Sequence, residues 1–457
     1  MRIRLDIPLT LGEIAEACSG VCKEELKGTP VEYLSTDTRE LCPEDLFVAI
    51  KGEKFDGNDY VGKAIELGAI PLSSVETDVG ITVTDSSLSL IGLARLYKSK
   101  LPNLKKVCGI TGSIGKSTTK EFAAIIISEH FSVTKSIGNF NNAVGMCLSI
   151  LSAKKNTEVL ILEMGMNAHG EISLLSKTAE PDIAVITSVG TSHIGRLGSR
   201  EEIARAKLEI LDGMKEGKLI VPADEALLCR PSAISFSTKN HSSDYYLKGS
   251  YGRFDLYYKE RWLFDGSFAI SEGHLLECLS AALALACEMG VPISKLRTGV
   301  QKINRSSLRQ RFEKAGSLTL YSDCYNSSLE SATAALEYIS SLCLYQKRSA
   351  VLGSVMELGG MSETIHKKIG EAAARAGCRW LYLVGESAQY MADGAVEHGF
   401  SPKNIRVFPD QQAISLIAEE VAVHSLPGEL ILFKGSRAMR LELVIERIKE
   451  ILKDKEE

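Results

Sequence analysis

Short apolar runs, separated by polar and glycine-containing stretches, recur through the middle of the chain. They cover residues 107–110, 159–163 and 183–187. Such runs are expected for strands of a parallel sheet whose two faces are both covered by helices. Helical patterns lie between them, and Ser199 followed by Glu202 resembles a capping box that would begin a helix over residues 201–211. This pattern predicts a parallel-sheet α/β domain in the middle of the chain.

The same alternation of strands and helices returns after residue 309. Strands are predicted at 318–322, 350–352, 381–384, 405–408 and 430–433. Helical patterns between them predict a second, Rossmann-like α/β sheet. Nearer the N-terminus the pattern predicts a helix over 11–18 and a strand over 45–50, and the aromatic and polar alternation of 244–270 predicts antiparallel strands. We therefore expect an α/β protein of three domains, with boundaries at residues 1–102, 103–308 and 309–457.

Length and composition narrow the class of protein. A chain of 457 residues is too long for one ordinary core, and 45% hydrophobic with 24% charged residues is typical of a soluble globular protein. The net charge of −5 gives no indication of a nucleic-acid or anionic-membrane partner. No stretch reaches the roughly 18 apolar residues that span a bilayer. The 11 cysteines lack C-x-x-C spacing, which favours reduced thiols over disulfides or a zinc site and predicts a cytoplasmic protein.

The segment after the first apolar run of the middle domain predicts nucleotide chemistry. Gly112 and Gly115 precede Lys116 and Ser117, and a helical pattern follows. Backbone N–H groups at such a turn surround phosphate, the lysine neutralises charge, and the hydroxyl can hold Mg²⁺. Ile110 stands where the strict phosphate-loop motif has glycine, so the loop is the variant T-G-x-x-G-K-[ST]. An ordinary strand-to-helix turn is the weaker alternative. The candidate nucleotide-binding residues are Gly112, Ser113, Ile114, Gly115, Lys116, Ser117 and Thr118.

Two further side chains follow strands of the same predicted sheet, at the edge where ligands bind in open α/β folds. Glu163 ends one strand, and His193 follows the next. Mg²⁺ on ATP prefers hard oxygen ligands, so we expect Ser117 and Glu163 to hold it. A structural pair with arginine or lysine is the alternative for Glu163, because an unpaired buried charge is costly. For His193 a ligand and an ordinary loop residue remain equally open.

Polar clusters elsewhere offer substrate contacts. Asn139, Asn141 and Asn142 follow Gly138, a pattern that suits a clamp for polar groups slightly better than a plain turn. In the third domain residues 323–326 and 434–437 each end a strand. They include Asp323, Tyr325, Asn326, Lys434 and Arg437, which could contact phosphate or carboxylate or could simply cap helices.

Taken in order, these segments resemble the Mur ligase superfamily of bacterial cell-wall synthesis. The likeness is greatest to its branch that joins D-alanyl-D-alanine to UDP-N-acetylmuramoyl-tripeptide. The motifs that carry the resemblance span nearly the whole chain: residues 35–39, 45–52, 55–57, 111–117, 138–142, 163–167, 170–172, 192–193, 206–209, 323–326, 356–359 with His366, and 434–437. Several positions depart from the family pattern, namely Met146, Ile194 with Gly195, Cys278, Ser354 and residues 327–329.

The resemblance implies an N-terminal UDP-substrate domain, a central ATPase domain and a C-terminal Rossmann-like domain that closes over the site. It implies ATP and Mg²⁺ as cofactors, with Lys116, Glu163, His193 and Lys207 in catalysis. Lys207 matches the superfamily's carbamylated lysine, which supplies a carboxylate to a second Mg²⁺; the first would be held by Ser117, Glu163 and His193. The uridine nucleotide would lie near Thr36, Asp37, Thr38, Arg39, Lys51, Phe55 and Asp56, and the remaining substrate contacts would come from Asn139, Asn141, Asn142, Lys434 and Arg437. Asp323, Tyr325 and Asn326 would meet the nucleotide.

The implied reaction is ATP-dependent amide ligation through an acyl phosphate, by a monomer in the cytoplasm. Its substrates would be UDP-N-acetylmuramoyl-tripeptide and D-alanyl-D-alanine. One alternative is a sister ligase that adds the third amino acid, or glutamate to folate. The other is a nucleotide-binding, ligase-like module without ligation.

Overall fold

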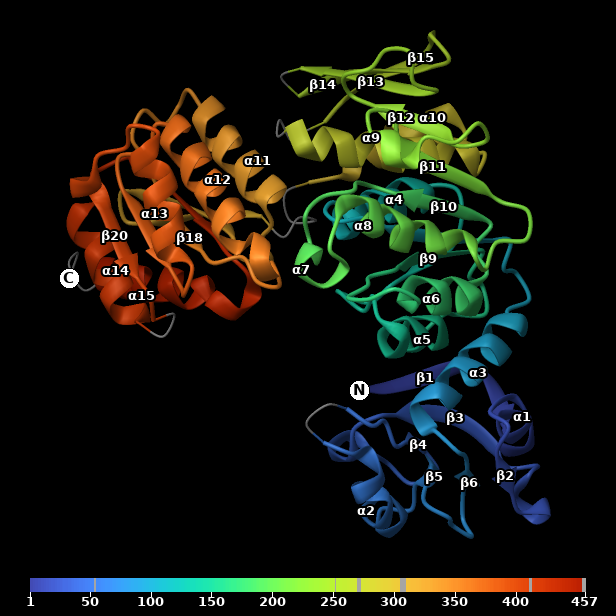
Figure 1. The fold of residues 1–457 in the computed structure, drawn as a ribbon. Coiled ribbons are helices and arrows are strands. Elements are labelled where there is room, and N and C mark those ends of the chain that lie inside the picture. Colours follow the sequence, from blue (N-terminus) through green and yellow to red (C-terminus); the bar gives the residue numbers. More distant parts are fainter. Residues whose placement is uncertain (53–54, 251, 269–272, 305–309, 411–412, 454–457) are drawn as a thin grey trace.

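Three β-sheets, each covered by helices, follow one another along the chain (Figure 1). The computed structural model describes residues 1–52, 55–250, 252–268, 273–304, 310–410 and 413–453. We call the three parts the N-terminal, central and C-terminal lobes. The predicted α/β class with three sheet-containing domains is confirmed. The boundary expected between residues 308 and 309 falls outside the described residues, and the exact domain limits remain predictions.

The N-terminal lobe has a six-stranded sheet in the order β1-β3-β4-β5-β6-β2. Strands β3 to β6 run parallel, whereas β1 pairs with β3 in antiparallel fashion. The helix and the strand predicted in this lobe correspond to α1 and β4. Its strands are β1 (Arg2–Thr10), β2 (Val21–Cys22), β3 (Pro30–Ser35), β4 (Leu46–Val48), β5 (Ile70–Ser73) and β6 (Ile81–Thr82), and its helices are α1 (Leu11–Ala17), α2 (Val61–Glu66) and α3 (Ser86–Ser99).

The central lobe has a nine-stranded sheet in the order β15-β14-β13-β12-β11-β10-β7-β9-β8. The three predicted apolar runs are β7, β9 and β10, which are parallel neighbours, so their carboxyl ends meet at one edge. The predicted antiparallel strands are β13 to β15. The strands are β7 (Lys106–Thr111), β8 (Val133–Lys135), β9 (Val159–Glu163), β10 (Ile183–Ile186), β11 (Lys218–Pro222), β12 (Ile234–Ser237), β13 (Tyr245–Ser250), β14 (Arg253–Tyr258) and β15 (Arg261–Ser267).

Seven α-helices are described in the central lobe: α4 (Lys116–Ile127), α5 (Ala143–Leu151), α6 (Glu171–Ala179), α7 (Ile194–Leu197), α8 (Arg200–Leu208), α9 (Gly273–Glu288) and α10 (Ile293–Lys302). Ser199 caps α8 by accepting the Glu202 N–H at 3.2 Å, which is one half of the predicted capping box. The helix begins one residue earlier than expected and continues as a 3₁₀ turn over Glu209–Leu211. Among the described residues, no helix combines the length and apolar character needed to cross a membrane.

The C-terminal lobe has a six-stranded sheet in the order β16-β17-β21-β18-β19-β20. All its strands are parallel except β16, and the five predicted strands are β17 to β21. One face packs against α11, α12 and α13, and the other against α14 and α15. The strands are β16 (Arg311–Ala315), β17 (Leu318–Asp323), β18 (Arg348–Gly353), β19 (Leu381–Val384), β20 (Ile405–Phe408) and β21 (Leu430–Lys434), and the helices are α11 (Leu329–Ser341), α12 (Ser362–Arg375), α13 (Ala388–Glu397), α14 (Ile414–His424) and α15 (Leu441–Lys453).

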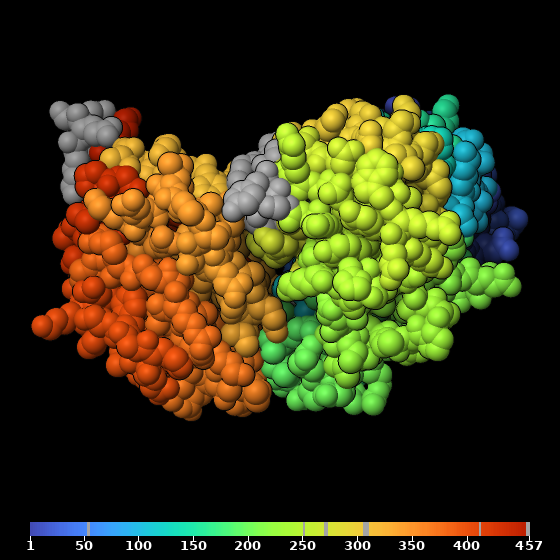
Figure 2. All heavy atoms as spheres, turned by 90° about the horizontal axis from the view of Figure 1, so that it is seen from above, coloured from blue at the N-terminus to red at the C-terminus, as the bar shows by residue number. Residues whose placement is uncertain are grey.

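The lobes are arranged around the central sheet. The N-terminal lobe joins it through α3, which packs against α5 and α6 (Figure 1). The C-terminal lobe lies to one side of the central lobe (Figure 2). None of the 11 cysteines is paired in a disulfide, as the sequence predicts.

Candidate functional site

The glycine turn after β7 forms the predicted loop at the N-terminus of α4. Gly115 is the N-cap of this helix with φ +84°, and Gly112 has φ +149°, so both occupy backbone conformations that favour glycine. A Cβ at Gly112 would also lie 1.9 Å from Thr187 Oγ1. The turn is held to the segment that follows β10 by hydrogen bonds from Ser113 N and Ile114 N to Ser188. The helix N-terminus is therefore fixed and suited to an anion.

Lys116 folds back over this loop. Its ammonium donates to the carbonyl oxygen of Gly112 at 2.6 Å and to that of Ser113 at 3.4 Å. The charge is thus already held beside the N–H groups that would surround a phosphate. A phosphate oxygen placed there would compete with neutral carbonyl acceptors, and charge-assisted hydrogen bonds are the stronger ones.

Glu163, at the end of β9, is buried and fully engaged. It accepts hydrogen bonds from Ser117 Oγ at 2.9 and 3.0 Å and from Asn141 Nδ2 at 3.4 Å. It also forms an ion pair with Lys120 Nζ at 3.3 Å. The structural lysine partner that the sequence left open is therefore present, together with the predicted hydroxyl neighbour.

Lys120 is a site residue that the sequence analysis missed. It is completely buried, and besides Glu163 it donates to the Gly138 carbonyl at 2.5 Å. It links α4, β9 and the asparagine-rich loop in one place. The available signal was its spacing. Lys120 lies three residues after Ser117 and therefore shares its helix face, and the helix then continues with the apolar residues 122–127.

His193 and Lys207 complete the predicted metal set from two other elements. His193 precedes α7. Burial is the largest cause that lowers the pKa of this ring. Glu357 opposes the effect by its hydrogen bond and charge, and the charges of Lys116 and Lys207 add to it. Lys207, on α8, is 2% exposed. Its burial and the nearby charge of Lys116 lower its pKa well below the ordinary value. Within the described part of the chain, no acceptor pairs with the Lys207 amine.

The side chains at this edge of the central sheet are suited to bind Mg²⁺ only together with an anion. The described residues contain no cluster of three or more histidine, cysteine, aspartate or glutamate side chains that could hold a metal. Glu163 is the one carboxylate of the predicted set, whereas Lys116, Lys120 and Lys207 bring three amines. Ser117 and Glu163 supply the oxygen donors that Mg²⁺ prefers. The surplus of positive charge suits a polyphosphate that carries the cation with it.

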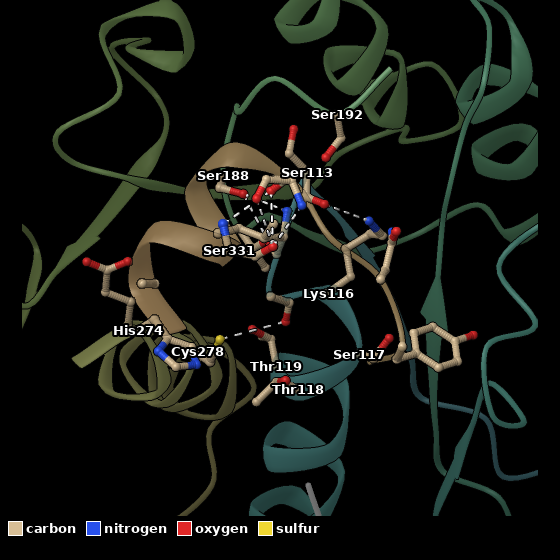
Figure 3. A pocket seen from close by; sticks show the side chains of 18 of the residues that line it. Ser113, Lys116, Ser117, Thr118, Thr119, Ser188, Ser192, His274, Cys278 and Ser331 are labelled. Carbon is tan, nitrogen blue, oxygen red and sulfur yellow. Dashed lines mark hydrogen bonds between the residues drawn. The ribbon is translucent and has the colours of Figure 1, made fainter. Parts of the chain in front are cut away.

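A pocket opens at this edge between the central and C-terminal lobes (Figure 3). Lys116, Ser117 and Thr118 lie at the start of α4, while His274 and Cys278 come from α9. Of the predicted residues, the following line it: Ser113, Ile114, Gly115, Lys116, Ser117, Thr118, Asn139, Asn141, Glu163, Asp323, Tyr325, Asn326 and Lys434. Further lining residues that the sequence analysis did not propose include Phe236, Glu277, Gln310 and Ser331.

Lys434 and Asp323 meet because β17 and β21 are paired, with these two residues in register. Lys434 is buried; it forms an ion pair with Asp323 at 3.3 Å and donates to the Asn326 carbonyl. The lysine therefore fixes the strand ends that face the pocket. Arg437 pairs with Glu442 at 3.1 Å, and its side chain does not line the pocket.

The asparagine loop divides its tasks. Asn139 and Asn141 face the pocket, but Asn142 caps α5 by accepting the Gly145 N–H at 2.8 Å.

Among the departures from the family pattern, Met146 is buried in α5, and Cys278 lies beside Gly115 in the pocket wall. Ser354 takes part in the fold, since its hydroxyl accepts the Ser387 N–H and donates to the Val384 carbonyl.

The predicted uridine-nucleotide residues lie apart from this pocket. Residues 36–39 follow β3, and Lys51, Phe55 and Asp56 follow β4. Because β3 and β4 are parallel neighbours, both groups lie at one edge of the N-terminal sheet. Arg39 pairs with Asp37 through two nitrogens, the shorter contact being 2.6 Å, and this hydrogen bonding holds the pKa of Asp37 well below its usual range. Lys51 Nζ lies 3.7 Å from Asp56 Oδ2, and Phe55 is 59% exposed to solvent. None of Thr36, Asp37, Thr38, Arg39, Lys51, Phe55 or Asp56 lines the pocket.

Comparisons with known proteins match each of the three lobes to one family. Residues 30–87 match the Mur ligase family catalytic domain, residues 110–260 the Mur ligase middle domain, and residues 310–437 the Mur ligase glutamate ligase domain. The UDP-N-acetylmuramoyl-tripeptide–D-alanyl-D-alanine ligase of Bacillus subtilis is 35% identical over 97% of this chain and 99% of its own length.

Solved structures agree. MurF from Acinetobacter baumannii is 26% identical, with a TM-score of 0.87 over 97% of this chain and 99% of that chain. MurF ligase from Thermotoga maritima, solved in complex with ADP, is 28% identical, with a TM-score of 0.80 over 92% of this chain and 98% of that chain.

Proposed function

The chain belongs to the Mur ligase family, and we propose that it joins D-alanyl-D-alanine to UDP-N-acetylmuramoyl-tripeptide at the expense of ATP. The products are the UDP-N-acetylmuramoyl-pentapeptide, ADP and phosphate. The observation that carries this proposal is a phosphate loop that faces polar side chains of a second lobe across one pocket, in a chain that matches D-alanyl-D-alanine ligases along almost its whole length. ATP is the nucleotide and Mg²⁺ its metal; the Thermotoga maritima relative was solved with ADP.

The reaction has two steps with different demands on the protein. The terminal carboxylate of the tripeptide attacks the γ-phosphorus of ATP, which gives an acyl phosphate and releases ADP. The amine of D-alanyl-D-alanine then attacks the carbonyl carbon, and phosphate leaves as the amide forms. Mg²⁺ supplies charge neutralisation on the phosphates. Closure of the C-terminal lobe over the pocket would exclude water, which would otherwise hydrolyse the acyl phosphate.

The residues of the phosphate loop would act by position and charge. The loop N–H groups and the N-terminus of α4 would bind the phosphates, and Lys116 would exchange its carbonyl partners for phosphate oxygens. Ser117 and Glu163, already within hydrogen-bond distance of each other, would hold the Mg²⁺ of ATP together with His193. Lys120 would keep the Glu163 carboxylate in place when no cation is bound.

Lys207 is suited to carbamylation. A neutral amine is the nucleophile toward CO₂, and the lowered pKa of Lys207 leaves more of the amine neutral near pH 7. Its nitrogen would attack the CO₂ carbon and lose one proton, giving a carbamate anion. The product replaces an unpaired buried amine by a carboxylate and offsets part of the positive charge of Lys116 and Lys120.

The edge of the N-terminal sheet would bind the uridine nucleotide. It combines an exposed aromatic ring, Phe55, with the guanidinium of Arg39 and the amine of Lys51. An aromatic face can stack on a base, and cations can meet a diphosphate. The carboxyl ends of parallel strands are the usual place for such a ligand.

Phosphate release tests the proposal. Purified protein with ATP, Mg²⁺ and UDP-N-acetylmuramoyl-tripeptide, carrying either lysine or diaminopimelate, is assayed with and without D-alanyl-D-alanine. We expect release that requires the dipeptide, a product heavier by one dipeptide less water, and loss of both with Lys116→Ala. Absence of dipeptide-dependent release with either tripeptide would refute the proposal and point to a sister ligase or a module without ligation.

A further inference from the structure

The C-terminal lobe contacts a short segment of the central lobe through polar groups. We call residues 190–197, which end in α7, the docking turn, and residues 355–359 the docking loop. Figure 1 shows α7 on the side of the central lobe that faces the C-terminal lobe. It packs there against η7, the 3₁₀ turn Gly359–Met361 that continues the docking loop. This contact lies beside a predicted metal ligand, His193.

The contact places a carboxylate on the histidine ring. Glu357 Oε2 lies 2.6 Å from His193 Nδ1, and Glu357 Oε1 accepts from Arg196 Nη2 at 2.9 Å. The Glu357 carbonyl also accepts the Gly195 N–H at 3.2 Å. A carboxylate in an ion pair only accepts hydrogen bonds, so the proton of the neutral ring lies on Nδ1 and the lone pair on Nε2. Nε2 is then the nitrogen able to bind a metal.

Gly195 makes this approach possible. A Cβ at this position would lie 2.4 Å from Gly359 N and 2.5 Å from the Leu358 carbonyl carbon, which are backbone atoms that cannot turn aside. The backbone of Gly195 itself is not in a left-handed conformation. Glycine is therefore needed here because the backbone of the neighbouring lobe comes so close, and not because the turn itself needs a left-handed residue. This position is also one of those that depart from the family pattern.

The docking loop is held from behind by its own lobe. His366 on α12 accepts the Val355 N–H with Nε2 at 2.9 Å and donates from Nδ1 to the Ser362 carbonyl at 2.7 Å. The ring is completely buried. Glu357 itself has φ +62°, an uncommon conformation for a non-glycine residue, and the surrounding contacts fix it. The loop is therefore built to present Glu357 at one place.

We propose that Glu357 is a positioning residue that the C-terminal lobe supplies to the metal site. By fixing the ring and tautomer of His193, it completes that ligand for the metal–nucleotide only while the two lobes are docked. Carboxylates that orient ligating histidines in this way commonly contribute about 10- to 100-fold to metal affinity. The inference rests on the proposed function for the identity of the metal–nucleotide.

Metal binding is the direct test, and it needs no turnover. Mn²⁺ is titrated into the full-length protein with saturating ADP and followed by electron paramagnetic resonance. We expect Glu357→Ala to weaken Mn²⁺ binding about 10- to 100-fold. Glu357→Gln should lose less, because its amide oxygen can still accept from Nδ1. Binding of ADP without metal should not change.

Two further comparisons separate positioning from general damage. The double variant His193→Ala with Glu357→Ala should bind Mn²⁺ no more weakly than His193→Ala alone, because Glu357 acts through that ring. Gly195→Ala should weaken Mn²⁺ binding as Glu357→Ala does and should expand the protein in small-angle X-ray scattering. Gly360→Ala lies in η7, which faces Gly195, and nothing is near its added Cβ; it is the matched control and should change neither quantity.

Unchanged Mn²⁺ affinity in Glu357→Ala, within twofold, would overturn the proposal, as would additive losses in the double variant. Normal Mn²⁺ binding by an expanded Gly195→Ala would refute the dependence on docking. Urea unfolding of each variant establishes that it is folded. If Glu357→Ala is not folded, Glu357→Gln is used in its place. Dipeptide-dependent phosphate release by the wild-type protein reports on the proposed function separately, so either idea can fail without the other.

Discussion

The central lobe meets its two neighbours in different ways. Toward the N-terminal lobe a whole helix, α3, packs against α5 and α6, with Tyr97 completely buried between them. The Tyr97 hydroxyl accepts the Asp6 N–H and donates to the Ala153 carbonyl. Toward the C-terminal lobe the contacts are smaller: α7 packs against η7, α9 touches α11, and two carboxylates bridge the lobes. Glu357 meets His193 and Arg196, and Glu330 accepts the Thr191 N–H at 2.7 Å.

This difference indicates which junction can open. Separating the N-terminal lobe would expose a buried aromatic ring and the helix surface around it to water, which is costly. Separating the C-terminal lobe would break a smaller helix contact and return partly exposed charged groups to water, which costs less. We therefore expect the N-terminal and central lobes to move as one body, while the C-terminal lobe opens to admit substrates.

The largest effect is expected at Tyr97. Tyr97→Ala removes a completely buried ring, so we expect a loss of about 3–5 kcal/mol in the free energy of unfolding. Tyr97→Phe is the control; it removes only the two hydroxyl hydrogen bonds, at about 1 kcal/mol each. Urea unfolding measures both. A loss for Tyr97→Ala no larger than that of Tyr97→Phe would show that this ring does not anchor the N-terminal lobe.

A smaller loss is expected at Lys98 in the same junction. Its ammonium, 10% exposed, donates to the Ala179 carbonyl at 2.7 Å and pairs with Glu180 at 2.9 Å, at the C-terminal end of α6. Lys98→Met should cost about 1–2 kcal/mol, because charged hydrogen bonds to the helix end are lost. Arg95→Met, which removes an exposed partner of the Lys177 carbonyl, is the control. Equal losses in urea unfolding for the two variants would contradict the importance of burial.

At the other junction we expect a change in shape with little change in stability. Glu330→Ala removes the acceptor of the Thr191 N–H and hydroxyl. The free energy of unfolding should fall by less than about 1 kcal/mol. Small-angle X-ray scattering should show a more extended protein. A loss as large as that of Tyr97→Ala, with an unchanged radius of gyration, would show that both junctions are equally fixed.

The smallest expected effect is a pH dependence of the free energy of unfolding that originates at His366 in the C-terminal lobe. Burial lowers the pKa of His366 below the ordinary value of 6.5. The folded protein therefore binds this proton less readily than the unfolded chain. The contribution of neutral His366 to stability is complete above pH 6.5 and declines as the pH falls through the lower folded-state value. Urea unfolding from pH 7.5 to 5.5 should show a shallower decline in His366→Gln than in the wild-type protein; identical slopes would contradict this origin.

Local sequence signals predicted much of the fold and part of the site. Buried strands of parallel sheets have continuous apolar runs, so β7, β9 and β10 and the strands β17 to β21 could be read directly. The phosphate loop is contiguous, which is why its glycines and Lys116 were found. Among the strands of the N-terminal lobe only β4 was predicted, because most of these strands are short and carry mixed polar and apolar residues.

Contacts between distant residues could not be predicted in this way. The sequence left Glu163 open between a metal and a lysine partner, and only the fold brings Lys120 to it. The sequence did not indicate that Asn142 caps α5, and its expected contact with substrate stays a prediction. The motif at residues 356–359 was noticed without a role; its carboxylate meets His193 across the lobe boundary.

The three α/β units, the phosphate loop and the family resemblance could be predicted from the chain, because each is encoded by neighbouring residues or by motifs in a fixed order. Which charges are paired, and which have no partner, follows only from the folded arrangement. Lys120 and Lys207 are both buried lysines of the central lobe, but one meets a carboxylate and the other meets none among the described residues. Pairing depends on the distance between side chains on different elements, and local sequence does not specify that distance.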